Sequence, residues 1–178
     1  MMNKYVYTDK QLNELNQGPN VYSVNTEFAQ RKENRTNIVT AKSDNELKKG
    51  ETNTITTSDG QEFRVVATKS DPVTGFDGLA VAPVVNGEPD YKNVAVIAAG
   101  TDPGSPTKID VGTAVAERES GLSPQYRVAD RFVKEIMDDP RYEISQLSGY
   151  SQGSYMLKVG AKYHIPTTTF NAWFFYNS

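Results

Sequence analysis

The chain has 178 residues, of which 37% are hydrophobic and 23% are charged, and its formal net charge is −3. These proportions are typical of one globular domain, and the acidic balance argues against a nucleic-acid partner. The absence of cysteine excludes disulfides, thiolate metal sites and a cysteine nucleophile, and no apolar run approaches the roughly 20 residues of a transmembrane segment.

The N-terminal region differs in composition from the rest of the chain. Residues 1–58 are polar and rich in Asn, Thr, Lys and Glu, whereas apolar periodicity begins near residue 60. We therefore expect residues 1–58 to form a polar N-terminal extension packed on a domain formed by residues 59–178. The first residues lack the apolar core of a signal peptide. We accordingly expect a protein that is secreted by a route without such a signal, or a cytoplasmic protein.

One short helix is predicted within this extension, in the sequence TDKQLNELN. Thr8 or Asp9 is suited to cap its first turn, because the side-chain oxygen of either residue accepts a hydrogen bond from a free backbone N–H. Leu12 and Leu15 lie three positions apart and therefore on one face of the helix. That face is expected to pack on the domain.

The remaining elements follow from hydrophobic patterning in residues 59–178. Apolar runs predict strands at 61–70, 76–85, 94–99, 142–149 and 165–176, with a turn at Asn86-Gly87. Helical periodicity predicts helices at 123–140 and 152–164. The apolar side chains expected to face the core are Val128, Phe132, Val133, Ile136 and Met137 in the first helix and Tyr155, Met156 and Val159 in the second.

The order of these elements predicts the fold class. From residue 94 onward, strand, helix, strand, helix and strand alternate, which is the order of a βαβαβ crossover series. Crossovers of this kind join parallel strands. We therefore expect an α/β fold with a mainly parallel sheet flanked by helices.

The pentapeptide Gly149-Tyr150-Ser151-Gln152-Gly153 lies between the fourth predicted strand and the helix that follows it. A G-x-S-x-G sequence in this context can set its serine on a strained turn as a nucleophile. Its two glycines lack the Cβ atoms that would clash where strand and helix meet. Ser151 is thus the candidate nucleophile, and the backbone N–H of Gln152 is a candidate donor to an oxyanion. The alternative is a glycine-rich turn with a solvent-facing serine.

A second oxyanion donor is expected from the loop after the strand at 94–99. That strand leads into Gly100-Thr101 at the carboxyl edge of the predicted sheet, where open α/β folds bind ligands. Thr101 can donate its backbone N–H there, and a glycine-assisted turn without a site is the alternative. Asp102 and Asp110 follow in the same loop and are interpreted as solvated carboxylates, with a position in the lining of the pocket as the alternative. No grouping of carboxylates with the histidine predicts a metal site, and no cofactor is expected.

Three motifs, in this order along the chain, resemble the class 3 (fungal-type) lipases of bacteria, within the α/β-hydrolase fold. A-G-T at 99–101 is similar to the family's R-G-T oxyanion motif, with Ala99 in place of arginine. G-Y-S-Q-G at 149–153 is similar to the family's G-H-S-L-G elbow. T-F-N-A at 169–172 matches the start of the family's T-F-N-A-P-G, from which Trp173 departs.

This resemblance, which covers about residues 60–178, implies a function. It implies that Ser151 is the nucleophile and that the amides of Thr101 and Gln152 form the oxyanion hole. The implied reaction is hydrolysis of a carboxylic ester through an acyl-enzyme, with a lipid or another ester as substrate, as in a lipase or phospholipase. The lack of a signal peptide further resembles the lipase-domain toxins that Gram-positive bacteria export by type VII secretion.

The other two members of a catalytic triad do not follow Ser151 at the expected places. In this fold the acid and then the histidine come after the serine, but no Asp or Glu follows Ser151. The single histidine, His164, comes 13 positions after Ser151. A helix that rises about 1.5 Å per residue would carry it well beyond contact with the serine. We interpret His164 as a residue at the end of a helix, where the macrodipole favours it.

Three explanations of this incomplete triad stay open. The chain is a fragment of a longer lipase, a non-catalytic hydrolase-like module that binds a lipid or a protein, or a chain whose acid and base come from a second chain. We expect the chain alone to have little or no activity. A sheet that stops at the last predicted strand would expose the apolar segment 170–176. We therefore expect a protein partner or a further C-terminal segment to cover that edge.

Overall fold

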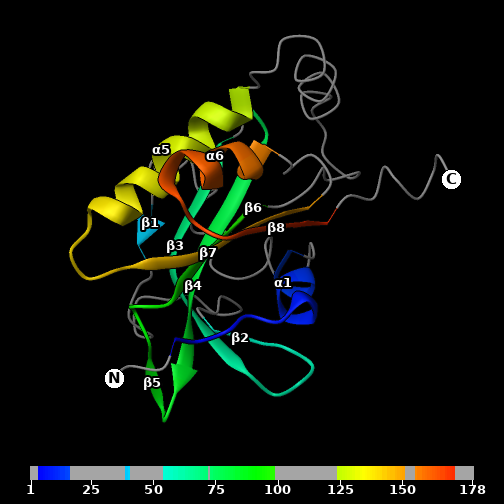
Figure 1. Cartoon of the computed structure of the whole chain (residues 1–178), viewed down its shortest axis with the longest axis vertical. Coiled ribbons are helices and arrows are strands. Elements are labelled where there is room, and N and C mark those ends of the chain that lie inside the picture. Colours follow the sequence, from blue (N-terminus) through cyan, green and yellow to red (C-terminus); the bar gives the residue numbers. More distant parts are fainter. Residues whose placement is uncertain are drawn as a thin grey trace, which may run out of the picture.

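The computed structural model describes residues 4–16, 39–40, 54–71, 73–98, 124–150 and 155–170. The helices of this part of the chain are α1 (Asp9–Asn16), α5 (Pro124–Asp138) and α6 (Met156–Tyr163). Its strands are β1 (Val39–Thr40), β2 (Thr54–Thr56), β3 (Glu62–Asp71), β4 (Phe76–Val85), β5 (Glu88–Pro89), β6 (Val94–Ala98), β7 (Ile144–Tyr150) and β8 (Thr167–Phe170). These strands form an eight-stranded sheet whose main path is β1-β3-β4-β6-β7-β8, with β2 beside β3 and β5 beside β4 (Figure 1).

The sheet is mixed, so the prediction of a mainly parallel sheet is wrong. β3 runs antiparallel to β1, β2 and β4, and β4 runs antiparallel to β5 and β6. Of the described pairs, β6–β7 and β7–β8 are parallel. The physical reason is the length of the connections. Residues 72–75 alone separate β3 from β4, whereas a parallel pair needs a crossover of about a dozen residues or more.

The tight turn between β4 and β5 has the predicted residues. Asn86 and Gly87 have positive φ values of 53° and 81°, which a two-residue hairpin turn of this hand requires. Glycine adopts this conformation without strain, and asparagine tolerates it better than most residues. The predicted turn at Asn86-Gly87 is therefore confirmed, and it returns the chain antiparallel to β4.

The second half of the chain forms the predicted crossover series. β6, α5, β7, α6 and β8 follow one another along the chain. β7 pairs in parallel with β6 on one side and with β8 on the other. The parallel strands predicted from residue 94 onward are thus confirmed, although they make up only one side of the sheet.

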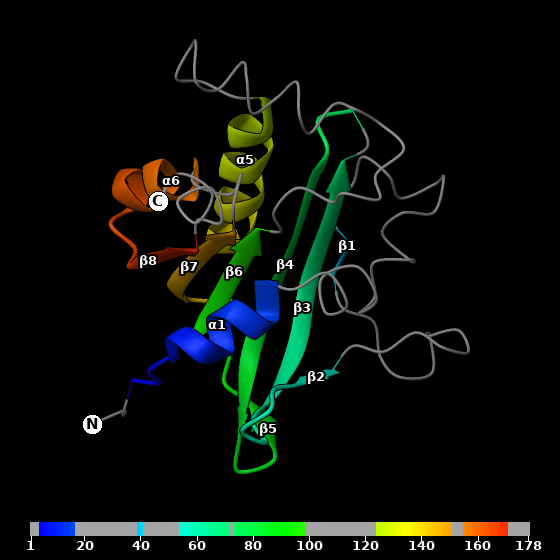
Figure 2. The same ribbon diagram turned by 90° about the vertical axis from the view of Figure 1, so that its right-hand side faces the viewer.

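Helices cover both faces of the sheet (Figure 1, Figure 2), and a hydrophobic cluster lies between the helices and the sheet on each face. On one face, α5 and α6 pack on β4, β6 and β7, with Phe76, Phe132 and Tyr155 among the largest buried side chains. On the other face, α1 lies against β6, β7 and β8, and its Leu12 and Leu15 join a cluster that includes Phe63 and Leu79. Because side chains alternate between the two faces of a strand, strands covered on both faces are apolar throughout. All residues of β6 are buried for this reason.

The helix predicted near the N-terminus is confirmed as α1. The Thr8 hydroxyl accepts a hydrogen bond from the backbone N–H of Gln11, and the Gln11 side chain accepts one from the backbone N–H of Thr8, both at 3.1 Å. This capping box satisfies two N–H groups at the start of the helix. Leu12 and Leu15 are buried against the sheet, as expected. The division of the chain at residue 58 stays a prediction, because much of the N-terminal region lies outside the described residues.

α5 buries most of the face that its sequence predicts. Phe132, Val133 and Ile136 are buried, and Val128 packs at the border of the same cluster. Met137 is 40% exposed, so its assignment to the core is wrong. Successive residues of a helix point about 100° apart, which turns Met137 from the face of Ile136 toward solvent.

None of the described helices is long and apolar enough to span a membrane.

Candidate functional site

The carboxyl ends of β6, β7 and β8 lie side by side at one edge of the sheet. Ala98 at the end of β6 pairs with Gly149 of β7, and Gly149 pairs with Thr169 of β8. These three strands are parallel, so the chain leaves all of them at the same edge. Thr101 follows Ala98 by three positions, and Ser151 follows Gly149 by two. The two strands that lead to the candidate oxyanion residue and to the candidate nucleophile are therefore hydrogen-bonded neighbours.

The structure describes only one of the predicted site residues. Gly149 is buried within β7, next to the last residue of that strand. Ser151, Gln152, Gly153 and Thr101 lie outside the described residues. Their roles as nucleophile, oxyanion donors and elbow glycine stay predictions, and what the structure adds is the arrangement of the strands on which they depend.

The predicted strand before Ser151 and the predicted helix after it are both present. β7 ends at Tyr150, and α6 begins at Met156. Tyr155, which directly precedes α6, is 2% exposed, and its ring centroid lies 6.4 Å from that of Phe76. Met156 and Val159 are buried in the same cluster. The inward face predicted for this helix is therefore confirmed, and it anchors the start of α6 beside the carboxyl ends of the parallel strands.

A glycine that the sequence analysis did not select brings α6 close to β8. A Cβ at Gly160 would overlap the Thr167 hydroxyl and would lie 2.9 Å from the backbone oxygen of Ile165. Only glycine permits this approach of the helix to the strand. The sequence held one signal for this contact, a single glycine inside a helical pattern. Such a glycine lowers helix stability, so its presence usually indicates that close packing requires it.

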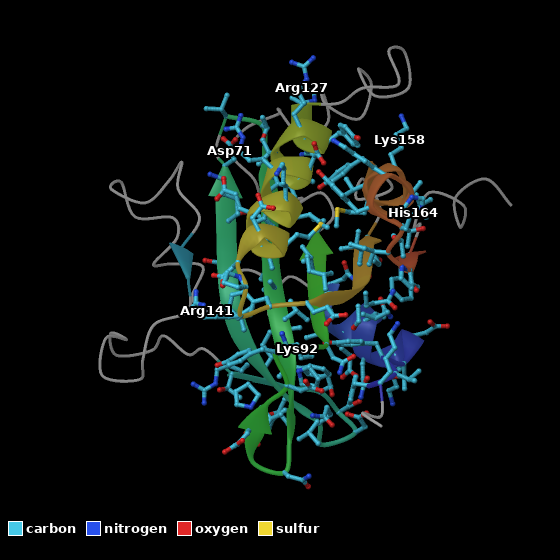
Figure 3. All side chains as sticks on the ribbon, turned by 60° about the vertical axis from the view of Figure 1, so that its left-hand side comes forward. Asp71, Lys92, Arg127, Arg141, Lys158 and His164 are labelled. Atoms are coloured by element: carbon cyan, nitrogen blue, oxygen red, sulfur yellow. The ribbon has the colours of Figure 1, made fainter. Side chains whose placement is uncertain are left out.

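His164 is a helix-terminal residue, as interpreted from the sequence. It is exposed and adopts the left-handed conformation with φ 56° and ψ 45°, and its backbone N–H donates to the oxygen of Gly160. It precedes β8, which pairs from Thr167 onward with β7 from Leu147 onward. His164 therefore lies toward the edge where these strands begin, whereas β7 ends at Tyr150. Figure 3 shows it on the surface beside the end of α6, away from Arg127 at the start of α5.

The end of α1 contacts β7, the strand that leads to the candidate nucleophile. The side-chain amide of Asn16 donates to the Ser148 hydroxyl at 2.8 Å and to the backbone oxygen of Leu12 at 2.6 Å. Asn16 is 3% exposed and Ser148 is fully buried. The sequence analysis missed this pair, because 132 positions separate the two residues and neither belongs to a motif.

The large pKa shifts among the described residues occur away from this edge. Hydrogen bonds from Arg141 hold the pKa of the Asp139 carboxyl at about 2. Both residues lie between the end of α5 and the start of β7. Burial raises the pKa of the Tyr7 hydroxyl, which donates to the backbone oxygen of Asn93 just before β6. In the described ranges, no three carboxylate or imidazole side chains gather into a potential metal site.

Comparisons of the chain with protein-family models, with curated proteins and with solved structures give no match.

Proposed function

We propose that this protein is a serine hydrolase of carboxylic esters, of the lipase or phospholipase type, with Ser151 as its nucleophile. One observation carries the proposal. The first two residues of the G-x-S-x-G sequence, Gly149 and Tyr150, are the last two of the parallel strand β7, and α6 begins at Met156. The neighbouring strand β6 ends at the same edge. This strand–turn–helix context is the one that the motif requires.

The proposed reaction uses groups at the ends of two strands. The Ser151 hydroxyl oxygen attacks the ester carbonyl carbon, and the carbonyl oxygen takes on negative charge. The backbone N–H groups of Gln152 and Thr101 donate hydrogen bonds to that oxygen. The alcohol leaves with a proton, an acyl-serine forms, and water then hydrolyses it. The choice of a lipid ester rests on the resemblance to class 3 lipases.

The general base for Ser151 is not assigned to a described residue. A serine hydroxyl is a weak nucleophile unless a base takes its proton. His164 is unsuited to this role, because it lies beyond the far end of α6 from the elbow. We therefore expect the chain alone to react slowly and an added base to accelerate the reaction.

Labelling with a fluorophosphonate tests this proposal. The serine oxygen attacks phosphorus, fluoride leaves, and a covalent serine adduct forms that mass spectrometry can locate. We expect slow labelling of the chain alone and an acceleration of about tenfold or more by imidazole, which acts as a general base. The adduct should lie on Ser151 and be absent from Ser151→Ala. Ser145→Ala is the matched control, because it removes a serine of β7 that lies six positions before Ser151.

The rival proposal is a non-catalytic hydrolase-like module that binds a lipid or a protein. The position of His164 favours it, because the one imidazole of the chain cannot serve the elbow. The same experiment separates the two proposals. Absence of any Ser151 adduct, with and without imidazole, would contradict the hydrolase proposal and leave the binding module as the better one.

A further inference from the structure

A buried polar pair joins α1 to the carboxyl end of β7. Asn16 is the last residue of α1, and Ser148 lies two positions before the end of β7. The Asn16 amide nitrogen donates to the Ser148 hydroxyl at 2.8 Å, and both side chains are buried. A hydrogen bond in such surroundings is stronger than in water and holds its partners in one geometry.

The orientation of the Asn16 amide follows from its contacts. Its nitrogen also donates to the backbone oxygen of Leu12 at 2.6 Å, and only the NH₂ group can donate to a carbonyl oxygen. The amide oxygen, Oδ1, is consequently left buried without a hydrogen-bond partner. An unsatisfied buried acceptor destabilises a fold, whereas an apolar side chain would fill the same place without this penalty.

Asn16 and Ser148 are polar side chains that are buried beside apolar ones. α1 covers the sheet with Leu12 and Leu15, which belong to the apolar cluster on this face, and Asn16 directly follows Leu15. A buried polar link within an apolar face fixes one register between a helix and a strand, because a shift in either element breaks it. Here it fixes α1 against the strand residue three positions before Ser151.

We propose that Asn16 is a positioning residue for the nucleophile: through Ser148 it holds the carboxyl end of β7 in the geometry that the elbow needs. This inference rests on the proposed function, because it assigns α1 a role in the reaction of Ser151. A small displacement of a reacting group lowers the rate strongly without a matching change in binding. The N-terminal helix thus contributes to catalysis from the face of the sheet opposite α5 and α6.

Labelling kinetics in the presence of imidazole test this role. We expect Asn16→Ala and Ser148→Ala each to lower the maximal labelling rate by about tenfold, with little change in the probe concentration that gives half of that rate. The double variant should lose little more than either single variant, because both substitutions break the same link. Rates are compared per folded molecule, with the folded fraction taken from circular dichroism.

Leu15→Ala is the matched control for general destabilisation. It truncates a fully buried side chain next to Asn16 in the same helix. Its expected loss of stability equals or exceeds that of Asn16→Ala, but its maximal labelling rate per folded molecule should match the parent chain. Equal maximal labelling rates for the parent chain and Asn16→Ala would overturn the inference. Equal losses of labelling rate per folded molecule in Asn16→Ala and Leu15→Ala would overturn it as well.

Amide hydrogen exchange supplies a readout that needs no activity. In Asn16→Ala, the amides of Ser148–Tyr150 should exchange faster than in Leu15→Ala, while those at the start of β7 should not. If the parent chain does not label at all, the proposed function fails, and exchange alone decides whether Asn16 holds the strand end. An equal exchange pattern in the two variants would then contradict the positioning role.

Discussion

The antiparallel and the parallel parts of the sheet differ in how their strands are connected. β3, β4 and β5 are joined by short turns, and their pairing follows from adjacency along the chain. β6, β7 and β8 are brought together by α5 and α6, so their pairing depends on helix packing. The candidate site lies on the parallel part. The three parallel strands end at the same edge, and the chain leaves all of them there. A hairpin turn instead joins two neighbouring strands directly.

Two substitutions with the largest expected effect test whether the two faces of this sheet form one cooperative unit. Phe132→Ala removes a buried ring of α5, and Phe63→Ala removes a buried ring on the face of the sheet that α1 covers. Each substitution should lower the free energy of unfolding by about 3–5 kcal/mol. Urea titrations followed by circular dichroism should show one transition for each variant. A separate early transition in Phe63→Ala alone would show that the α1 face unfolds independently.

Gly160→Ala should disturb the parallel part and spare the antiparallel part. The added methyl group would overlap the Thr167 hydroxyl, so α6 must move away from β8. We expect a loss of about 1–3 kcal/mol in the free energy of unfolding. Hydrogen exchange should increase in β7 and β8 before it increases in β3 and β4. Unchanged stability in Gly160→Ala would show that α6 and β8 do not pack so closely.

Removing the Tyr7 hydroxyl should weaken the link between the N-terminal segment and the central strand. This hydroxyl donates to the backbone oxygen of Asn93 at 2.6 Å, and burial raises its pKa, so that it stays protonated at neutral pH. Tyr7→Phe should cost about 1–2 kcal/mol in thermal or urea unfolding, because the buried acceptor loses its donor. Tyr91→Phe is the control, because Tyr91 is 40% exposed and the change should stay within about 0.5 kcal/mol.

The smallest expected effect is the loss of stability when a pH-dependent contact between α5 and α6 is removed. Partial burial of Asp130 opposes its ionisation, but hydrogen bonds from Tyr163 and Lys162 outweigh this and hold its pKa below the ordinary 3.8. The contact therefore stabilises the fold above about pH 4 and is lost as the pH falls through the lowered pKa. Asp130→Asn should cost less than about 1 kcal/mol at pH 7. That difference from the parent chain should shrink toward pH 2, and a constant difference would contradict this assignment.

Local patterns in the sequence predicted the elements of this protein more reliably than their assembly. The capping residue Thr8, the turn at Asn86-Gly87 and the inward face of α6 all depend on residues within one or two turns of each other. The strand before the elbow and the helix after it were predicted for the same reason. The placement of His164 at the end of α6 also followed from the sequence, because helix geometry converts a spacing into a distance.

Contacts between distant parts of the chain required the tertiary structure. The sequence of α1 gives no sign that Asn16 meets Ser148, because no local rule pairs the end of a helix with a strand 132 positions away. The close approach at Gly160 likewise depends on how α6 lies against β8. A search for motifs finds the residues that carry chemistry, but not those that hold them in position.

By itself, the sequence determined where helices, strands and turns form, and it placed the G-x-S-x-G motif between a strand and a helix. Backbone propensity, capping and hydrophobic periodicity act over a few residues, so these features can be read directly from the chain. The tertiary structure decided that the sheet is mixed, that α1 covers its second face, and that Asn16 contacts the strand leading to Ser151. Those outcomes depend on which apolar faces bury each other, a free energy that belongs to the whole assembly rather than to any single segment.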